Sequence, residues 1–399
     1  MTVNDTVLAN NKMPANNKPL RIALLTYATK PRGSVVHTLE LAQALQALGH
    51  EPCVFALDKD GQGFYREVSF KTVAVPAQPC EDGIDALIKQ RIQEFVDFFE
   101  HFFERENARY DIYHAQDCLS ANALAVLKNQ KKIACFVRTV HHIEDYKSPY
   151  LQACQEKSIY QSDRCLCVSK VWQQTLQTDY GIQAHRVING VSERFSAIPN
   201  ETDAKTAQAC GINLAAGPIY LTVGGIEPRK NSIRLLKAFS QVRKEHARAK
   251  LIIVGGATLF DYQDYRRDFM ALVAQAGLQD ALILPGVVSD EALPSVYRLA
   301  DAFVFPSVQE GWGLVVLEAI ASGLPVLTAN RAPFTEFLST GAAKLVDPEN
   351  IDAIAQAMMA MVKPNVAQAL IQQSAESIEH YQWKTSAQMH LDLYRQLVP

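Results

Sequence analysis

The stretch VGGIEPRKNSIRLLKAF (223–239) decides how this chain is interpreted, because a strand-like run ends in two glycines and a helical pattern follows. Pro228 stiffens the turn, and Arg229 and Lys230 stand just before a helix that is predicted to begin near Asn231. Cations at a helix N-terminus oppose the helix dipole, which favours anions there. They make sense where a phosphate lies between the side chains and the free helix amides, although a solvated charged turn is the plain alternative. The stretch predicts a phosphate-binding β–turn–α unit.

Short apolar runs alternate with helical patterns on both sides of this stretch. The runs predicted to be strands are 20–28, 52–58, 111–116, 132–140 and 164–169 in the first half, and 219–224, 250–255, 281–286, 302–307, 325–330 and 342–347 in the second. Strands that are apolar on both faces and joined by helices are what a parallel sheet covered on both sides requires. The polar region 190–218 interrupts the pattern and is predicted to be the linker. The fold class is therefore α/β, with two doubly wound, Rossmann-like domains that face a cleft.

The length of 399 residues fits two domains at roughly 100 to 200 residues each. The last segment has one apolar stripe and is predicted to pack back across the molecule. The predicted division is a disordered arm (1–18), an N-terminal Rossmann-like domain (19–198), a C-terminal Rossmann-like domain (199–380) and a C-terminal crossover helix (381–399).

Composition narrows the class of protein. With 48% hydrophobic and 20% charged residues the chain can bury a full core, which excludes disorder as its main state. A net charge of −3 argues against a nucleic-acid partner, so small molecules are the expected partners. The eight cysteines contain no C-x-x-C and fit a reducing, cytoplasmic compartment. No run reaches the ~18 apolar residues of a membrane span, and the aromatic helix 84–103 is predicted to pack in the core, with membrane association left open.

A second constellation lies in SVQEGWGLVVLEAIASGLPVL (307–327). Glu310 ends the loop after a predicted strand, and Gly311 and Gly313 permit a close approach of the backbone to a ligand. Glu318 is the only charge in an apolar helix, where a carboxylate is costly unless it has hydrogen-bond donors. Sugar hydroxyls are suitable donors, and a purely structural carboxylate is the alternative.

The order of these motifs resembles a known family. A lysine-bearing loop, followed some 80 residues later by E-x₇-E and then by SGLPVL, is similar to the retaining nucleotide-sugar glycosyltransferases of the GT-B fold, family four. The stretches VSKVWQQTL (168–176) and HRVINGVSERF (185–195) agree with the family's pattern before the linker. The resemblance covers about residues 20 to 398.

The resemblance implies a role for each matching residue. Lys230 and Arg229 would hold the diphosphate of the donor, Glu310 would meet the donor sugar or its surroundings, and Glu318 would bind the ribose. The other expected donor-binding positions are Gly33, Gly225, Gly311, Trp312, Gly313 and Leu314. Many members carry an arginine where this chain has Gly225, and two adjacent glycines where it has Gly33 and Ser34.

The N-terminal half adds a candidate histidine in FVRTVHHIEDY (136–146). The strand is predicted to end near Val140, so that His141 projects into the cleft, similar to the family histidine near the sugar, while His142 points elsewhere. A histidine in such a place is more often structural. His114 and Asp117 also follow a strand and are weaker candidates.

The sequence thus predicts a retaining enzyme that moves a sugar from a nucleotide-diphosphate donor to an acceptor hydroxyl, with His141, Lys230 and Glu310 as its catalytic residues. The acceptor, a glycan, a lipid or a small molecule, is expected on the N-terminal side. No metal or cofactor is expected, since Asp58 and Asp60 fit a solvated turn. Two alternatives stay open: a nucleotide-sugar epimerase on the same fold, and a catalytically silent subunit that binds a sugar nucleotide.

Overall fold

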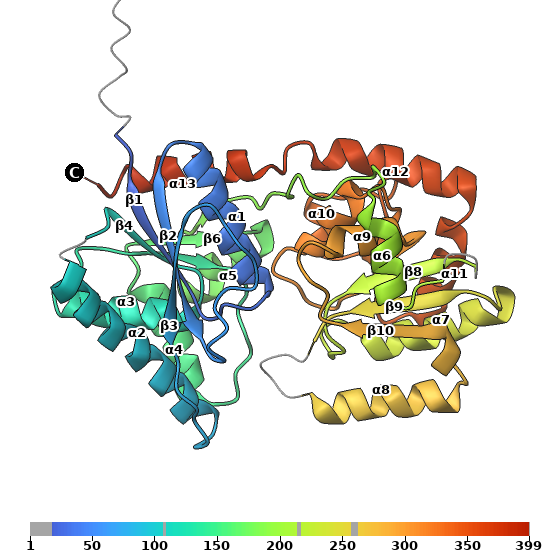
Figure 1. Ribbon diagram of the computed structural model, residues 1–399, viewed down its shortest axis with the longest axis horizontal. Coiled ribbons are helices and arrows are strands. Elements are labelled where there is room, and N and C mark those ends of the chain that lie inside the picture. The colour runs from blue at the N-terminus through green and yellow to red at the C-terminus, as the bar shows by residue number, and fades with distance from the viewer. Residues whose placement is uncertain (1–17, 107–108, 214–216, 257–261, 399) are drawn as a thin grey trace, which may run out of the picture.

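The computed structural model describes residues 18–106, 109–213, 217–256 and 262–398, and these form two lobes side by side (Figure 1). The elements of the N-terminal lobe are β1 (Arg21–Thr26), α1 (Gly33–Ala47), β2 (Glu51–Asp58), β3 (Lys71–Pro76), α2 (Ile84–Glu106), β4 (Ile112–Ala115), α3 (Cys118–Asn129), β5 (Val137–Val140), α4 (Pro149–Tyr160), β6 (Arg164–Cys167), α5 (Lys170–Tyr180) and β7 (His185–Arg186). The predicted arm, 1–18, lies outside the described residues except for Lys18.

The C-terminal lobe repeats the alternation of strands and helices. Its elements are α6 (Thr202–Ala209), β8 (Ile219–Val223), α7 (Ser232–Glu245), β9 (Lys250–Val254), α8 (Gln263–Gln275), η1 (Gln279–Ala281), β10 (Leu282–Gly286), α9 (Leu293–Arg298), β11 (Ala302–Phe305), α10 (Leu314–Ala321), β12 (Val326–Ala329), η2 (Phe334–Glu336), β13 (Lys344–Val346), α11 (Ile351–Met361) and α12 (Pro364–Ile378). The last helix, α13 (Trp383–Tyr394), returns to the N-terminal lobe.

Each lobe is built on one parallel sheet. The strand order is β3-β2-β1-β4-β5-β6-β7 in the N-terminal lobe and β10-β9-β8-β11-β12-β13 in the C-terminal lobe. Every strand pair within these sheets is parallel. This confirms the predicted α/β class with two doubly wound units.

The alternation of side chains along each strand explains why both faces of a sheet are covered. In β8, Ile219 and Leu221 belong to one hydrophobic core and Tyr220 to the other. Successive strand residues point to opposite faces, so an uninterrupted apolar run needs helices on both sides.

The elements that were not predicted from the sequence include β3 and α6. β3 is an edge strand whose side chains are mostly exposed or half-buried and which ends at Pro76, so it lacks the apolar run of a central strand. α6 lies inside the predicted linker 190–218 and is a short polar helix. Its Asp203 forms a 2.7 Å ion pair with Arg298 of α9, which anchors α6 to the C-terminal lobe.

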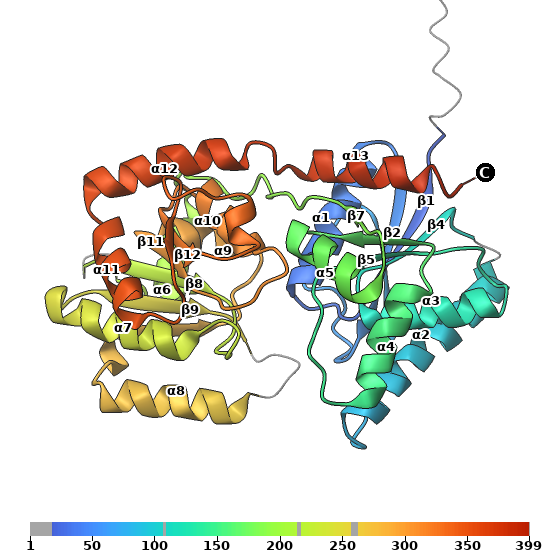
Figure 2. The ribbon, with the colours of Figure 1, turned by 180° about the vertical axis from the view of Figure 1, so that it is seen from behind.

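The crossover helix α13 is part of the N-terminal core. Figures 1 and 2 both show α12 over the C-terminal lobe and α13 over the N-terminal lobe. Trp383 and Tyr394 pack in the same core as α1. The two segments that join the lobes run side by side, because Val191 pairs with Gln382 and a Cβ on Gly190 would overlap the backbone of Trp383. The predicted return of the C-terminal helix is confirmed.

A group of four charged side chains, the interlobe ion-pair network, joins the lobes. Arg66 lies 2.8 Å from Glu40 of α1 and 3.2 Å from Asp290, which precedes α9. Arg194, in the segment between the lobes, also pairs with Asp290 and lies 3.9 Å from Glu40. The four side chains are between 6% and 23% exposed, so removal of one partner leaves charge in a poorly solvated place.

Across the described ranges, every helix is too short or too polar to traverse a lipid bilayer.

The network predicts a large loss of thermal stability for Arg66→Ala. Glu40 would keep only its longer contact with Arg194, and a loss of about 2 kcal/mol or more lowers Tm by at least ~4 °C in a unit of this size. Scanning calorimetry measures it, with Arg267→Ala as the control because that arginine pairs with Asp264 at 72% and 85% exposure. Equal shifts in both variants would show that the network contributes nothing special.

Candidate active site

The candidate site lies where the strand order of each sheet reverses. In the C-terminal lobe the chain adds β9 and β10 on one side of β8 and then β11 on the other. The loops after β8 and β11 carry Lys230 and Glu310. In the N-terminal lobe the reversal lies between β1 and β4, which are followed by Gly33 and Gln116. In doubly wound sheets ligands bind at this position, outside the carboxyl ends of the strands.

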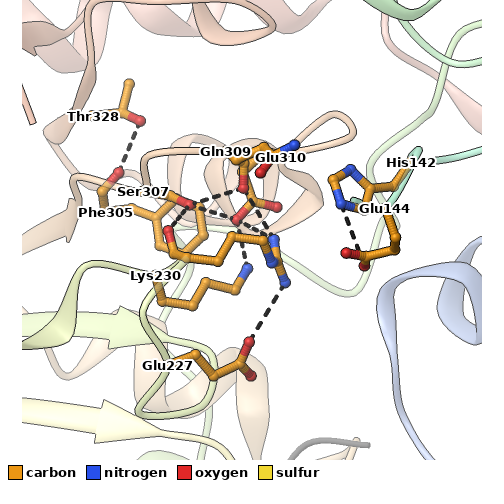
Figure 3. Close-up of polar contacts among 10 residues, drawn as sticks. His142, Glu144, Glu227, Lys230, Phe305, Ser307, Gln309, Glu310 and Thr328 are labelled. Carbon is orange, nitrogen blue, oxygen red and sulfur yellow. Dashed lines mark hydrogen bonds and ion pairs between the residues drawn. The ribbon is translucent and has the colours of Figure 1, made fainter. Parts of the chain in front are cut away.

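A single carboxylate oxygen holds both predicted cations of the C-terminal lobe. Lys230 Nζ donates to Glu310 Oε1 at 2.7 Å (Figure 3), and Arg229 lies 2.8 Å from the same oxygen. Ser307 Oγ also donates to it at 2.8 Å, and Arg229 donates to the Gln309 carbonyl at 3.2 Å. The sequence placed the two cations correctly before α7 but gave no sign that Glu310, 80 residues away, would bind them.

The pKa values of the ionisable groups in this cluster are shifted by burial and by their charged neighbours. Burial acts to raise the pKa of Glu310, but Lys230 and Arg229 outweigh burial and hold that pKa at about 2. Burial lowers the pKa of Lys230, and Glu310 opposes that effect. Glu227 lies 3.8 Å from Arg229, and burial raises its pKa. The Arg229 and Lys230 side chains keep 31% and 15% of their surface exposed, so neither is sealed off from solvent.

Close packing explains why glycines stand in and beside the loop after β8. Gly224 has a φ of 149°, and a Cβ there would lie 3.2 Å from the Lys230 side chain. A Cβ on Gly255 would lie 2.5 Å from the Gly224 carbonyl oxygen, and Gly225 is half-buried next to it. Asn231 locks the turn in the left-handed conformation and donates to two carbonyl oxygens of neighbouring loops. The glycines let Lys230 lie across the end of β8.

The buried carboxylate of Glu318 accepts a hydrogen bond, as its burial requires. Tyr297 Oη donates to Glu318 Oε2 at 2.8 Å. Burial is the main cause that raises the pKa of Glu318 to about 7. No spacing in the sequence pairs Tyr297 with Glu318, because the two residues lie on different helices, α9 and α10.

The loop before α10 touches the N-terminal lobe. A Cβ on Gly311 would overlap the carbonyl oxygen of His141, so only glycine allows this approach. Leu314 is half-buried and packs against cores of both lobes. The two predicted parts of the site, from 136–146 and 307–327, therefore meet at one junction.

Trp312 and Gly313 shape the same loop from inside the C-terminal lobe. Trp312 is 3% exposed, and its ring stacks on Phe337 with ring centroids 4.8 Å apart. Gly313 has a φ of 101°, and a Cβ there would lie 2.7 Å from Phe334. The Trp312 ring therefore packs inside the C-terminal lobe, which the sequence motif alone does not indicate.

The two adjacent histidines follow the end of β5 at Val140, as predicted. His141 is half-buried, and its Nε2 lies 2.9 Å from Gln116 Oε1. His142 Nε2 lies 3.3 Å from Glu144, and Figure 3 shows that pair facing the Glu310 cluster. His142 was expected to point elsewhere, but the alternation of strand side chains no longer applies beyond Val140.

The remaining candidates of the N-terminal lobe differ in what surrounds them. Gly33 begins α1, and a Cβ there would meet nothing within 4 Å. His114 is fully buried, and Asp117 caps α3 by accepting from Ser120 N at 2.9 Å.

In the predicted turn at Asp58 and Asp60, the two carboxylates bind backbone amides of the same loop. Each aspartate accepts a hydrogen bond from an amide of its own loop. Among the residues that the structure describes, no three histidine, cysteine or acidic side chains gather in a way that could hold a metal ion.

Both halves of the chain match glycosyltransferase families. Residues 31–194 match the family described as Glycosyltransferase Family 4, and residues 213–377 match Glycosyl transferases group 1. D-inositol 3-phosphate glycosyltransferase of Xylanimonas cellulosilytica is 26% identical, over 96% of this chain and 98% of that protein.

Solved structures share the architecture. Sucrose-phosphate synthase of Thermosynechococcus elongatus has a TM-score of 0.78 at 23% identity and covers 95% of this chain and 99% of its own. HepE of Anabaena, in complex with UDP-glucose, has a TM-score of 0.74 at 17% identity and covers 94% and 99%. The fold is GT-B. The chain belongs to the group 1 glycosyltransferases and resembles family four.

Proposed function

We propose that this glycosyltransferase moves a sugar from a nucleotide-diphosphate donor to an acceptor hydroxyl and retains the anomeric configuration. The observation that carries the proposal is the pair of cations, Lys230 and Arg229, held together by the buried Glu310 at the strand-order reversal. The UDP-glucose complex of HepE supports a donor of this kind on the same fold. In the proposal the C-terminal lobe (199–380) binds the donor and the N-terminal lobe (19–198) the acceptor.

The proposed sugar transfer requires stabilisation of the leaving group, which is the nucleoside diphosphate of the donor. As the bond between the anomeric carbon and the phosphate oxygen breaks, negative charge gathers on the departing diphosphate. Lys230 and Arg229 are already fixed near that charge, so little rearrangement is needed to stabilise it. The acceptor oxygen then bonds to the anomeric carbon from the same face, and its proton passes to the leaving phosphate. No metal, cofactor or separate base takes part in this proposal.

The other residues serve binding and position. Glu310 fixes both cations beside the donor sugar, and Glu318 accepts hydrogen bonds from the ribose hydroxyls. His141 contacts a hydroxyl of the donor sugar. The donor-binding surface also includes Gly33, Gly225 and the backbone of residues 311–314.

Lys230→Ala tests the leaving-group role. Loss of one preorganised charge partner costs ~10² to 10³ in turnover. The fold should survive, because Glu310 keeps Arg229 and Ser307 as partners. Release of nucleoside diphosphate from a panel of nucleotide sugars, with excess chelator present, measures the rate. Lys237→Ala is the control, since Lys237 is exposed on the same helix, α7. Activity of Lys230→Ala within about threefold of the parent would remove Lys230 from the site.

Glu318 predicts a pH dependence of nucleotide binding. Its carboxyl group, with a pKa of about 7, is neutral below that pH and charged above it. A charged acceptor binds hydroxyl donors more strongly by ~1 kcal/mol, so UDP affinity should rise about fivefold from pH 6 to pH 8 relative to Glu318→Gln. Calorimetric titration measures the UDP affinity of both proteins. The comparison removes the contribution of UDP ionisation, because that contribution is the same in the two proteins. Parallel pH profiles would show that Glu318 does not hold the ribose.

The raised pKa of Glu318 also determines how this residue changes the folding stability with pH. Because the folded pKa of Glu318 lies above its ordinary value, its contribution to folding falls as pH rises through about 7. Glu318→Gln should therefore gain thermal stability relative to the parent at pH 8 but not at pH 5.

A further inference from the structure

His141 rests on the side chain of Gln116, which follows β4. His141 Nε2 and Gln116 Oε1 are 2.9 Å apart. The amide nitrogen of Gln116 lies 3.4 Å from both ring nitrogens of His114. Equal distances to the two nitrogens place the amide over the face of the ring. An N–H group is favoured against a π face and a carbonyl oxygen is not, so the Gln116 oxygen faces His141.

The His114 ring is itself fixed on both edges. Its Nδ1 lies 2.6 Å from the Tyr394 hydroxyl and its Nε2 lies 2.8 Å from Thr139 Oγ1. His114, Thr139 and Tyr394 are all completely buried. They come from β4, β5 and α13. The helix α13 therefore contacts His114, the residue that supports Gln116 and, through it, His141.

This arrangement determines which nitrogen of His141 carries the proton. The Gln116 oxygen can only accept, so His141 Nε2 must donate, and in a neutral imidazole Nδ1 then keeps its lone pair. Among the described residues no hydrogen bond involves His141 Nδ1. Nor is that nitrogen one of the fully buried polar atoms without a partner, so part of its surface is accessible.

The surroundings keep His141 neutral. Burial is the main cause that lowers its pKa well below the usual range. The charged and titratable groups around it act in the same direction and come from α1, β5, β4 and α13: His37, Arg138, His114 and His390.

We propose that Gln116 is a positioning residue that fixes the Nε2–H tautomer of His141 and is held in place by His114 and by Tyr394 of α13. His141 then offers Nδ1 as a hydrogen-bond acceptor to a hydroxyl of the sugar. The catalytic consequence rests on the function proposed above, whereas the tautomer itself does not. The crossover helix α13 thereby supports the site as well as the fold.

The tautomer is measured directly by NMR of ring-¹⁵N-labelled histidine, with His141→Ala used to assign the signal. The parent should show Nε2–H alone. Gln116→Leu removes the acceptor, so the Nδ1–H form should appear and turnover should fall about tenfold, equivalent to ~1.4 kcal/mol. Gln116→Glu keeps an acceptor but adds negative charge, which raises the pKa of His141. That variant should keep Nε2–H and gain an acid limb in its pH–rate profile that the parent lacks.

A second pair of variants tests the link to α13. Tyr394→Phe removes the hydroxyl that holds His114, and Tyr220→Phe removes an equally buried hydroxyl, which donates to the Met358 carbonyl at 3.1 Å in the other lobe. Both should lower Tm by similar amounts. Only Tyr394→Phe should disturb the His141 tautomer and slow turnover, by about threefold or more.

The outcomes separate the inference from the function. An unchanged tautomer in Gln116→Leu, or equal kinetic effects of the two tyrosine variants, overturns the inference. An altered tautomer together with full activity of His141→Ala supports the role of Gln116 as the residue that fixes the tautomer. That combination contradicts instead the proposed contact between His141 and the sugar.

Discussion

One ion-pair cluster organises the candidate site: the buried carboxylate of Glu310 binds Lys230 and Arg229 at 2.7 and 2.8 Å. Two cations so close together would repel one another, and burial would add a desolvation cost. The carboxylate between them reduces both costs, and its own pKa falls to about 2 as a result. The two cations can therefore be fixed in place and partly exposed before a ligand binds. A site prepared in this way stabilises charge that develops during a reaction.

The second constraint is the contact between the lobes. The carbonyl oxygen of His141 lies where a side chain on Gly311 would be, so the loop that follows Glu310 meets the strand end that carries the histidines. The interlobe ion-pair network and the crossover helix α13 hold the same junction from other sides. The cations of one lobe and the histidines of the other thus belong to one arrangement, although they come from sheets with separate cores.

The sequence predicted those features that depend on local pattern. Apolar runs gave the central strands of both sheets, and glycines and charges marked the loops that carry Lys230 and Glu310. It did not reveal partners that are distant along the chain, such as Tyr297 for Glu318 or Gln116 for His141, because no spacing links them. β3 was missed because an edge strand needs no continuous apolar run. The family pattern included Trp312, yet only packing shows that its ring turns into the core.

A crystal structure of the protein with bound UDP would show directly whether Lys230 and Arg229 hold the diphosphate. Oxygens of the diphosphate should lie within hydrogen-bond distance of Lys230 Nζ and of the Arg229 guanidinium, while Glu310 keeps its contact with at least one of these two cations. The ribose should lie beside Glu318 in the same structure. A diphosphate bound elsewhere, with both cations still in contact only with Glu310, would show that Lys230 and Arg229 do not bind the donor.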